Sequence, residues 1–312
     1  MRCNLSIILV LLSLCYSEMV LSDSEIFSER IDARNTALGG LSISYYDGLN
    51  PALIKNKQSS IHFSYREKYN DKIKVTSLSY LFFVDKHPYF INLINRTISD
   101  IPDTRAAWDD NGDLIPDYHE INYFKINNIN QTELGLQLST ISIYNRFTLG
   151  FKLKTSIFQL AEYKSYGIGS DIAILYEMNK LLNINLNFLD LISTKYWNTN
   201  RWETLMPLIK LGFNIDLDNF VFGVESSKYI KYHNLSLYNI GLEYQSTKSI
   251  FYRIGASHNT KISLGLGFKL SVLNIDYAYI QPSKKLPFDD NHVLSLGISL
   301  EEISRIKDKI KP

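Results

Sequence analysis

The sequence predicts an all-β protein: a closed antiparallel transmembrane β-barrel of about fourteen strands, with an N-terminal hatch segment in the lumen. Three observations predict this fold. Apolar and polar residues alternate through most of residues 59–300, short and long connections between these runs alternate, and an export signal precedes them. Such alternation places one face of each strand in an apolar medium and the other face in a polar one.

Residues 1–22 have the pattern of a cleaved secretory signal. Arg2 gives a positive start, and the apolar run at 5–14 is shorter than the roughly 20 residues that a membrane-spanning helix needs. An uncleaved anchor is the alternative. Both cysteines, Cys3 and Cys15, lie in this segment, so we expect no disulfide and no thiolate site in the mature chain. The signal predicts export to the outer membrane of a Gram-negative-type bacterium.

Residues 23–58 are predicted to form the hatch. Neither the helical nor the strand period fits all of 31–54, which is rich in small residues and contains Gly39-Gly40 and Asn50-Pro51. A barrel of about fourteen strands encloses a lumen too wide for one layer of side chains to fill. We therefore expect this irregular segment to plug the barrel that follows it.

The barrel is predicted to span residues 59–300. Long connections are expected at 99–130, 191–204 and 281–291, and short turns between most other strands. In outer-membrane barrels the short turns are periplasmic, so the insertion at 99–130 is expected to be extracellular. A soluble β-sandwich is the competing fold, because its strands alternate too. The charged tail 301–312 places Ile303, Ile306 and Ile310 at helical spacing, which predicts a short periplasmic helix.

Composition excludes several classes of protein. A formal net charge of +1 gives no nucleic-acid footprint, and a mean hydropathy of −0.10 excludes a polytopic helical membrane protein. The histidines are scattered, and the sequence contains no recognisable nucleophile, metalloprotease or phosphate-loop motif. We therefore predict no catalytic residues and no enzyme activity.

The sharpest local motif is a candidate calcium loop, DDNGDLIPDYHE, at 109–120. Its candidate oxygen ligands occupy positions 1, 3, 5, 7, 9 and 12 of an EF-hand-type loop. They are Asp109, Asn111, Asp113, the Ile115 carbonyl, Asp117 and Glu120. Leu114 stands where that pattern has glycine, and a left-handed conformation there would cost roughly 1–2 kcal/mol. The alternative is a solvated acidic loop stiffened by Pro116.

Two stretches resemble the PorV/PorQ family of the FadL-like superfamily of outer-membrane barrels. They are ARNTALGGLSISYYDGLNPA at 33–52 and GLGFKLSVLNIDYAYIQPSKKLPFDDNHVLSLGISL at 265–300, and GIGSDIAILY at 167–176 is similar to a strand of the same proteins. The resemblance implies a fourteen-stranded barrel with a lumenal hatch. Its hatch residues here would be Gly39, Gly40, Asp47, Asn50, Pro51 and Ala52. Leu300 departs from the family, which has an aromatic residue at this point.

Three functions remain open on this basis. The first is a PorV-like accessory to protein secretion or surface attachment, with secreted cargo proteins or secretion machinery as partners of its extracellular loops. The second is a FadL-like transporter of hydrophobic small molecules, such as fatty acids or hydrocarbons, gated by the hatch. The third is a structural barrel or adhesin. Outer-membrane lipids are expected partners in every case, because fold-level likeness alone does not decide among functions.

Overall fold

The computed structural model describes residues 18–20, 26–42, 48–54, 58–69, 71–108, 112, 115, 119, 121–231, 236–258, 260–282 and 291–310. Before the barrel come β1 (Glu18–Val20), two 3-10 turns, η2 (Ile26–Ser28) and η3 (Pro51–Ile54), and helix α2 (Ala33–Ala37). The strands that follow are β2 (Ser60–Lys68), β3 (Ile73–Val84), β4 (His87–Asp103), β5 (Asn127–Tyr144), β6 (Phe147–Leu160), β7 (Tyr163–Glu177), β8 (Leu182–Trp197), β9 (Trp202–Leu205), β10 (Leu208–Leu217), β11 (Phe220–Tyr229), β12 (Ser236–Thr247), β13 (Ile250–Ser257), β14 (Thr260–Lys269), β15 (Leu273–Pro282) and β16 (Asn291–Ser299). A 3-10 turn, η5 (Tyr123–Lys125), precedes β5, and helix α3 (Leu300–Ile310) ends the described chain.

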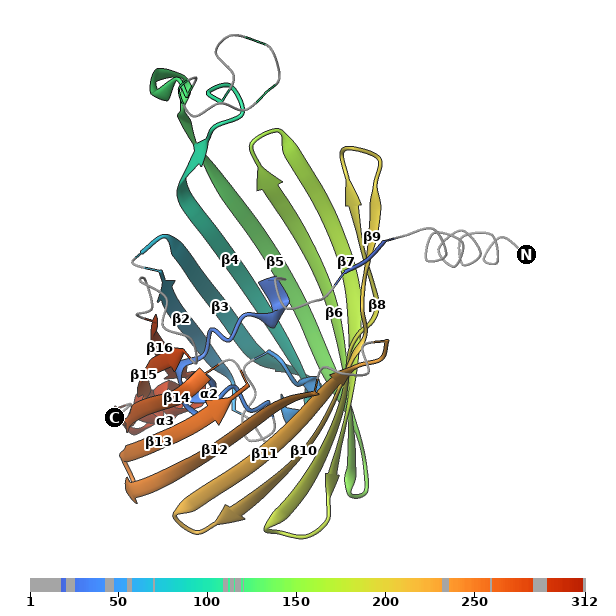
Figure 1. Cartoon of the computed structure of the whole chain (residues 1–312). Helices are drawn as coiled ribbons and strands as arrows, with labels where there is room; N and C mark the ends of the chain where they lie inside the picture. The colour runs from blue at the N-terminus through green and yellow to red at the C-terminus, as the bar shows by residue number, and fades with distance from the viewer. Residues whose placement is uncertain are drawn as a thin grey trace, which may run out of the picture.

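Fourteen of the described strands form a closed antiparallel ring (Figure 1). β2 pairs with β16, with Tyr65 opposite Leu294, and this pairing closes the barrel. The other two described strands lie outside the ring, because β9 folds back on the upper part of β8 and β1 pairs with β9 in parallel. Among the described helices, none has both the length and the apolar character needed to cross a membrane. The predicted fold class is confirmed.

The two faces of the wall have opposite chemistry. On β5, Leu136 is 45% exposed on the outer surface, whereas its neighbour Gln137 is 1% exposed in the lumen. A soluble protein buries its apolar residues, so an apolar exterior around a polar interior is the arrangement of a barrel that faces lipid. Aromatic residues of adjacent strands also pair near the short-turn end, as in Phe147–Tyr176 and Phe220–Tyr244, both with ring centroids 4.7 Å apart.

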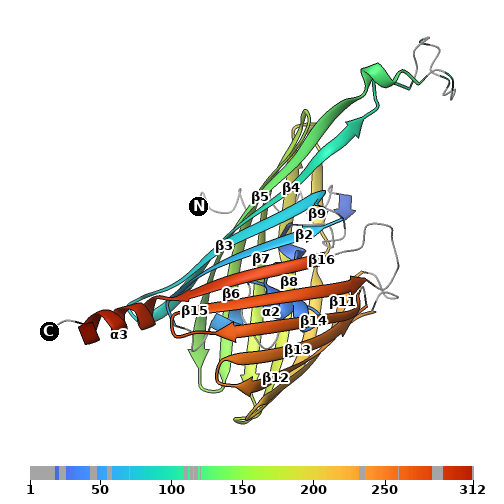
Figure 2. The same cartoon turned by 90° about the vertical axis from the view of Figure 1, so that its left-hand side faces the viewer.

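The two ends of the barrel differ, as the sequence predicts. Asp85 and Lys86 join β3 to β4 with φ angles of 49° and 70°, the conformation of a tight hairpin turn. β4 and β5 run far past the rim at the opposite end and carry the longest connection of the described strands (Figure 1). Helix α3 leaves β16 at the short-turn end, on the other side of the molecule from this hairpin (Figure 2).

Two predicted loop boundaries are wrong, and both have the same cause. β4 continues to Asp103 and β5 begins at Asn127, so the connection between them is shorter than the predicted 99–130. β8 continues to Trp197, into the loop predicted at 191–204. Each strand contains a bulge, at Asp100 (φ 56°) in β4 and at Asp190 (φ 54°) in β8. A bulge adds residues to one strand and interrupts the alternation, so a strict period of two stops there although the strand continues.

Part of the predicted signal segment is described. Residues 18–20 form β1, and Met206 donates its backbone N–H to the carbonyl of Val20 at 2.9 Å. The rest of 1–22 lies outside the described residues, so cleavage of the signal stays a prediction.

Candidate functional site: the lumenal hatch and its vestibule

The described part of the hatch, residues 26–42 and 48–54, lies inside the barrel (Figure 1). Helix α2 contacts β13, β14, β15 and β16, whereas η3 contacts β4, β5, β6 and β7. These two groups of strands form opposite parts of the ring. The hatch therefore crosses the lumen and is attached to both sides of it.

Local sequence explains where α2 begins and ends. The Asp32 carboxylate caps the helix by accepting the N–H of Asn35 at 2.9 Å. Gly39 and Gly40 follow with φ angles of 72° and 79°, a conformation that glycine adopts without steric cost. The Gly39-Gly40 pair thus stops the helix and turns the chain back across the lumen.

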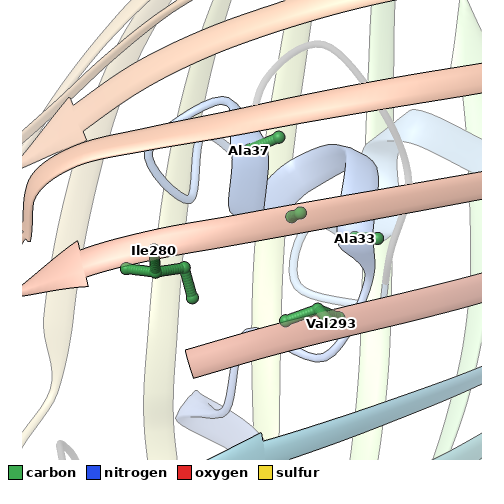
Figure 3. Close-up of a cluster of buried hydrophobic side chains, with 5 residues drawn as sticks. Ala33, Ala37, Ile280 and Val293 are labelled. Atoms are coloured by element: carbon green, nitrogen blue, oxygen red, sulfur yellow. The ribbon is translucent and has the colours of Figure 1, made fainter. Parts of the chain in front are cut away.

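Small residues allow α2 to approach the wall closely. Ala33 and Ala37 pack with Ala278, Ile280 and Val293 of β15 and β16 in one buried cluster (Figure 3).

Glycines of the wall serve the same purpose, because a side chain there would occupy the space of the hatch. A Cβ atom at Gly241 would lie 2.5 Å from the carbonyl oxygen of Leu38, and one at Gly255 would collide with the backbone of Gly39. On the other side of the lumen, Gly150 faces the backbone of Ala52 in the same way. The sequence pattern alone did not single out these positions, although a glycine at an inward position of a strand signals a close backbone approach.

The Asn50-Pro51-Ala52 motif is a hydrogen-bonded turn. The Asn50 side chain accepts the N–H of Ala52 at 3.0 Å and donates to the Ser42 carbonyl at 3.0 Å and to Asn185 of β8 at 3.1 Å. An aspartate could not donate these bonds, which explains the need for an amide here. All three residues of this turn are buried.

Buried ion pairs hold the start of the hatch. The Glu29 carboxylate lies 2.5 Å from Lys68, 3.3 Å from Arg96 and 3.6 Å from Arg66. Burial acts to raise the pKa of Glu29, but the charges of Lys68, Arg66 and Arg96 outweigh it and lower that pKa from 4.5 to about 2. Glu29 therefore stays ionised at neutral pH and attaches the hatch to β2 and β4.

A second network holds α2. Arg34 donates two hydrogen bonds to Glu243 of β12, at 2.7 and 2.8 Å. Arg253 of β13 lies 2.5 Å from the same carboxylate and 2.6 Å from Asp276 of β15. Further along, the N–H of Ser42 donates to Glu225 of β11 at 3.2 Å. Charged side chains of neighbouring strands thus contact the hatch at several points along its length.

A cavity of about 400 Å³ lies beside the hatch, and we call it the vestibule. Phe27, Arg30 and Leu49 of the hatch line it, together with wall residues such as Lys210 and Leu237. The lining includes His258 and Asn291, which border connections at the long-loop end. The vestibule therefore lies on the long-loop side of the lumen.

Most predicted site residues fall into two groups. Of the hatch residues, Gly39, Gly40 and the Asn50-Pro51-Ala52 turn are in the lumen, whereas Asp47 lies outside the described residues. Five of the candidate calcium ligands also lie outside the described residues: Asp109, Asn111, Asp113, Asp117 and Glu120. The sixth, Ile115, is described and is 66% exposed. Within the described part of the chain, no three His, Cys, Asp or Glu side chains cluster as metal ligands do.

Comparisons with known proteins identify the fold. No protein-family model matches the chain, and no curated protein matches it in sequence. The solved structures that match over most of their length include a deltaS2S3 mutant of the TodX monoaromatic hydrocarbon channel (TM-score 0.61, 11% identity, 86% of this chain and 98% of that chain), the Ralstonia pickettii toluene transporter TbuX (0.60, 10%, 86% and 97%) and a deltaS2 mutant of TodX (0.58, 11%, 88% and 100%). This chain shares their fold. Their identities are too low to carry function across, and the PorV resemblance finds no support among these matches.

Proposed function

We propose that this protein is an outer-membrane channel for hydrophobic small molecules, in which movement of the hatch gates the lumen. The observation that carries the proposal is the combination of a hatch that crosses the lumen with a vestibule of about 400 Å³ beside it. A cavity of this size suits a small ligand. The fold likeness to a monoaromatic hydrocarbon channel and a toluene transporter supports the same choice.

Uptake of toluene tests the proposal. A Gram-negative host with an intracellular toluene-responsive reporter would express the wild-type barrel, and the reporter response at low external toluene would be compared with that of cells without it. Leu237 is buried and lines the vestibule, so Leu237→Trp should fill the cavity and reduce the response. The matched control is Leu264→Trp, because Leu264 is 45% exposed on the outer face. A response that is independent of the barrel, or equal for both variants, would contradict the proposal.

A secretion accessory of the PorV type is the second candidate, and one structural feature favours it. The β4–β5 hairpin projects beyond the rim (Figure 2). In η5, which lies between these two strands, Tyr123 is 67% and Phe124 is 100% exposed. Exposed aromatic residues on a projecting element suit contact with a protein partner. On this hypothesis secreted proteins co-purify with the barrel, and replacement of 104–126 by a two-residue turn abolishes the association. Unchanged cargo recovery after that replacement would exclude the hairpin.

The loop at 109–120 is proposed to bind Ca²⁺. Gly112 has a φ of 80°, so the chain turns sharply two residues before Leu114. A sharp turn at Gly112 supports a loop that wraps around a cation. Isothermal calorimetry on the whole protein should detect calcium uptake that Asp113→Asn weakens. No heat at millimolar calcium would end this proposal.

A further inference from the structure

Helix α3 follows β16 directly at the short-turn end of the barrel, and its first turn is attached to the residue before β2. The N–H of Leu300 donates to the Ser59 carbonyl at 2.9 Å, and the Glu301 carboxylate accepts the N–H of Ser59 at 3.4 Å. β2 and β16 form the pairing that closes the barrel, so α3 begins beside this seam. Figure 2 shows the rest of the helix extending beyond the wall.

The described part of α3 is amphipathic. Leu300, Ile303 and Ile306 recur at every third residue and therefore lie along one side of the helix. Ser304 and Arg305 lie on the other side, where both are exposed. Ile306 is 39% exposed although it is apolar. The helix thus presents an apolar side that the described part of the protein covers only in part.

Aromatic side chains of the wall mark the depth at which α3 begins. By the register of β2 and β3, Ser59 lies level with Phe82. Phe82 stacks with Tyr80 and Tyr89, with ring centroids 5.1 and 5.8 Å apart. In membrane barrels such aromatic girdles lie at the level of the lipid headgroups, between the acyl chains and water. Leu300, which bonds to Ser59, is therefore at the boundary between membrane and water.

The apolar side of α3 also continues the outer surface of β16. Leu294, Leu296 and Ile298 point outwards at every second position of the strand, and Leu294 and Ile298 are 42% and 38% exposed. Leu300 is the next residue in this series. Because the outer surface of the wall faces lipid, the same apolar medium reaches the first turn of α3.

We propose that α3 lies on the inner leaflet of the outer membrane, with its apolar side among the acyl chains and with Ser304 and Arg305 in water. Amphipathic helices bind at this boundary between headgroups and acyl chains. Arg305 pairs with Glu302 at 2.5 Å, so apolar contact rather than net charge holds the helix there. In this position α3 anchors the end of β16, and with it the closing seam, to the membrane.

Spin labels at consecutive positions of α3 test the proposal. The full chain would carry Cys3→Ser and Cys15→Ser, so that each introduced cysteine is the only one. One cysteine at a time would replace Ile303, Ser304, Arg305 or Ile306. Each variant would be reconstituted into phosphatidylcholine vesicles, and its folded state would be verified by heat-modifiable mobility in gel electrophoresis. Collisions of the label with oxygen, which concentrates in lipid, would be compared with collisions with a water-soluble nickel chelate.

The expected result is a helical pattern. Labels at Ile303 and Ile306 should have a several-fold higher ratio of oxygen to nickel collisions than labels at Ser304 and Arg305, because only the first two face the acyl chains. The control is Leu136→Cys on the outer face of β5, where the label should report lipid.

Three results would overturn the proposal, and they differ in what they leave standing. If all four labels on α3 report water while the Leu136 label reports lipid, the wall assignment stands and the helix is free of the membrane. If the labels at Ile303 and Ile306 collide with neither reagent, a second copy of the chain covers this side. If the Leu136 label reports water, the lipid-facing wall on which the proposal rests is wrong as well. None of these outcomes depends on what passes through the channel.

Discussion

Arg34 of the hatch and Glu243 of β12 form a two-point ion pair, with donor–acceptor distances of 2.7 and 2.8 Å. Arg34→Gln leaves a buried carboxylate with one cation fewer, and breaking a fully buried pair costs about 3–5 kcal/mol. Arg34 is 20% exposed, so we expect a smaller loss. This loss of stability should appear as faster hydrogen–deuterium exchange of α2, whereas exchange of the barrel strands should not change. The control is Lys72→Gln, because Lys72 is 61% exposed in a 3.8 Å pair with Asp100.

The wall glycines provide a steric test of the hatch position. Gly255→Val places a side chain where the backbone of Gly39 lies, so we expect the hatch to leave its site and become sensitive to protease. Planar-bilayer conductance should rise at the same time. Ala256 is the next residue, on the opposite face of β13. Ala256→Val should therefore behave as the wild type, and equal effects of the two variants would refute the placement.

Acid should loosen the start of the hatch. The pKa of Glu29 is about 2 in the folded protein and 4.5 ordinarily, so its ion pairs contribute stability that is present above pH 4.5 and is lost as the pH falls towards 2. Hydrogen exchange of η2, compared with that of a Glu29→Gln variant at each pH, isolates this contribution. The difference between the two proteins should be large at neutral pH and vanish near pH 2. A constant difference would contradict this assignment.

The outer face of the barrel can be tested by charge. Leu136 is 45% exposed there, and an arginine near the bilayer midplane of such a barrel costs about 2–4 kcal/mol. Leu136→Arg should therefore reduce the amount of folded barrel in outer-membrane fractions. Leu136→Phe keeps the surface apolar and should assemble normally. Normal assembly of the arginine variant would show that this face does not contact lipid.

The sequence predicts the wall of this protein well because each strand repeats one simple pattern, as in Leu134, Leu136 and Leu138, which alternate with Gly135, Gln137 and Ser139. That pattern fails at Asp100 and Asp190, where bulges interrupt the alternation without ending the strand.

The contacts of the hatch are harder to predict. Ala33 and Ser295, or Arg34 and Glu243, are far apart in the chain, and no periodic signal connects them. The location of the irregular segment could be read from its composition, whereas its partners depend on how the barrel closes. The lining of the vestibule is hard to predict for the same reason, because its described side chains come from the hatch and from many strands.

The most direct test of the central claim is to tether the hatch. The N–H of Ala33 donates to Ser295 of β16 at 2.8 Å, so cysteines at these two positions can reach each other, and the sequence contains only Cys3 and Cys15 besides. Toluene uptake would be measured in cells that express Ala33→Cys/Ser295→Cys, with Ala33→Cys alone as control. Gating by the hatch predicts low uptake in the oxidised double variant and wild-type uptake after reduction. Wild-type uptake with the disulfide formed would contradict it.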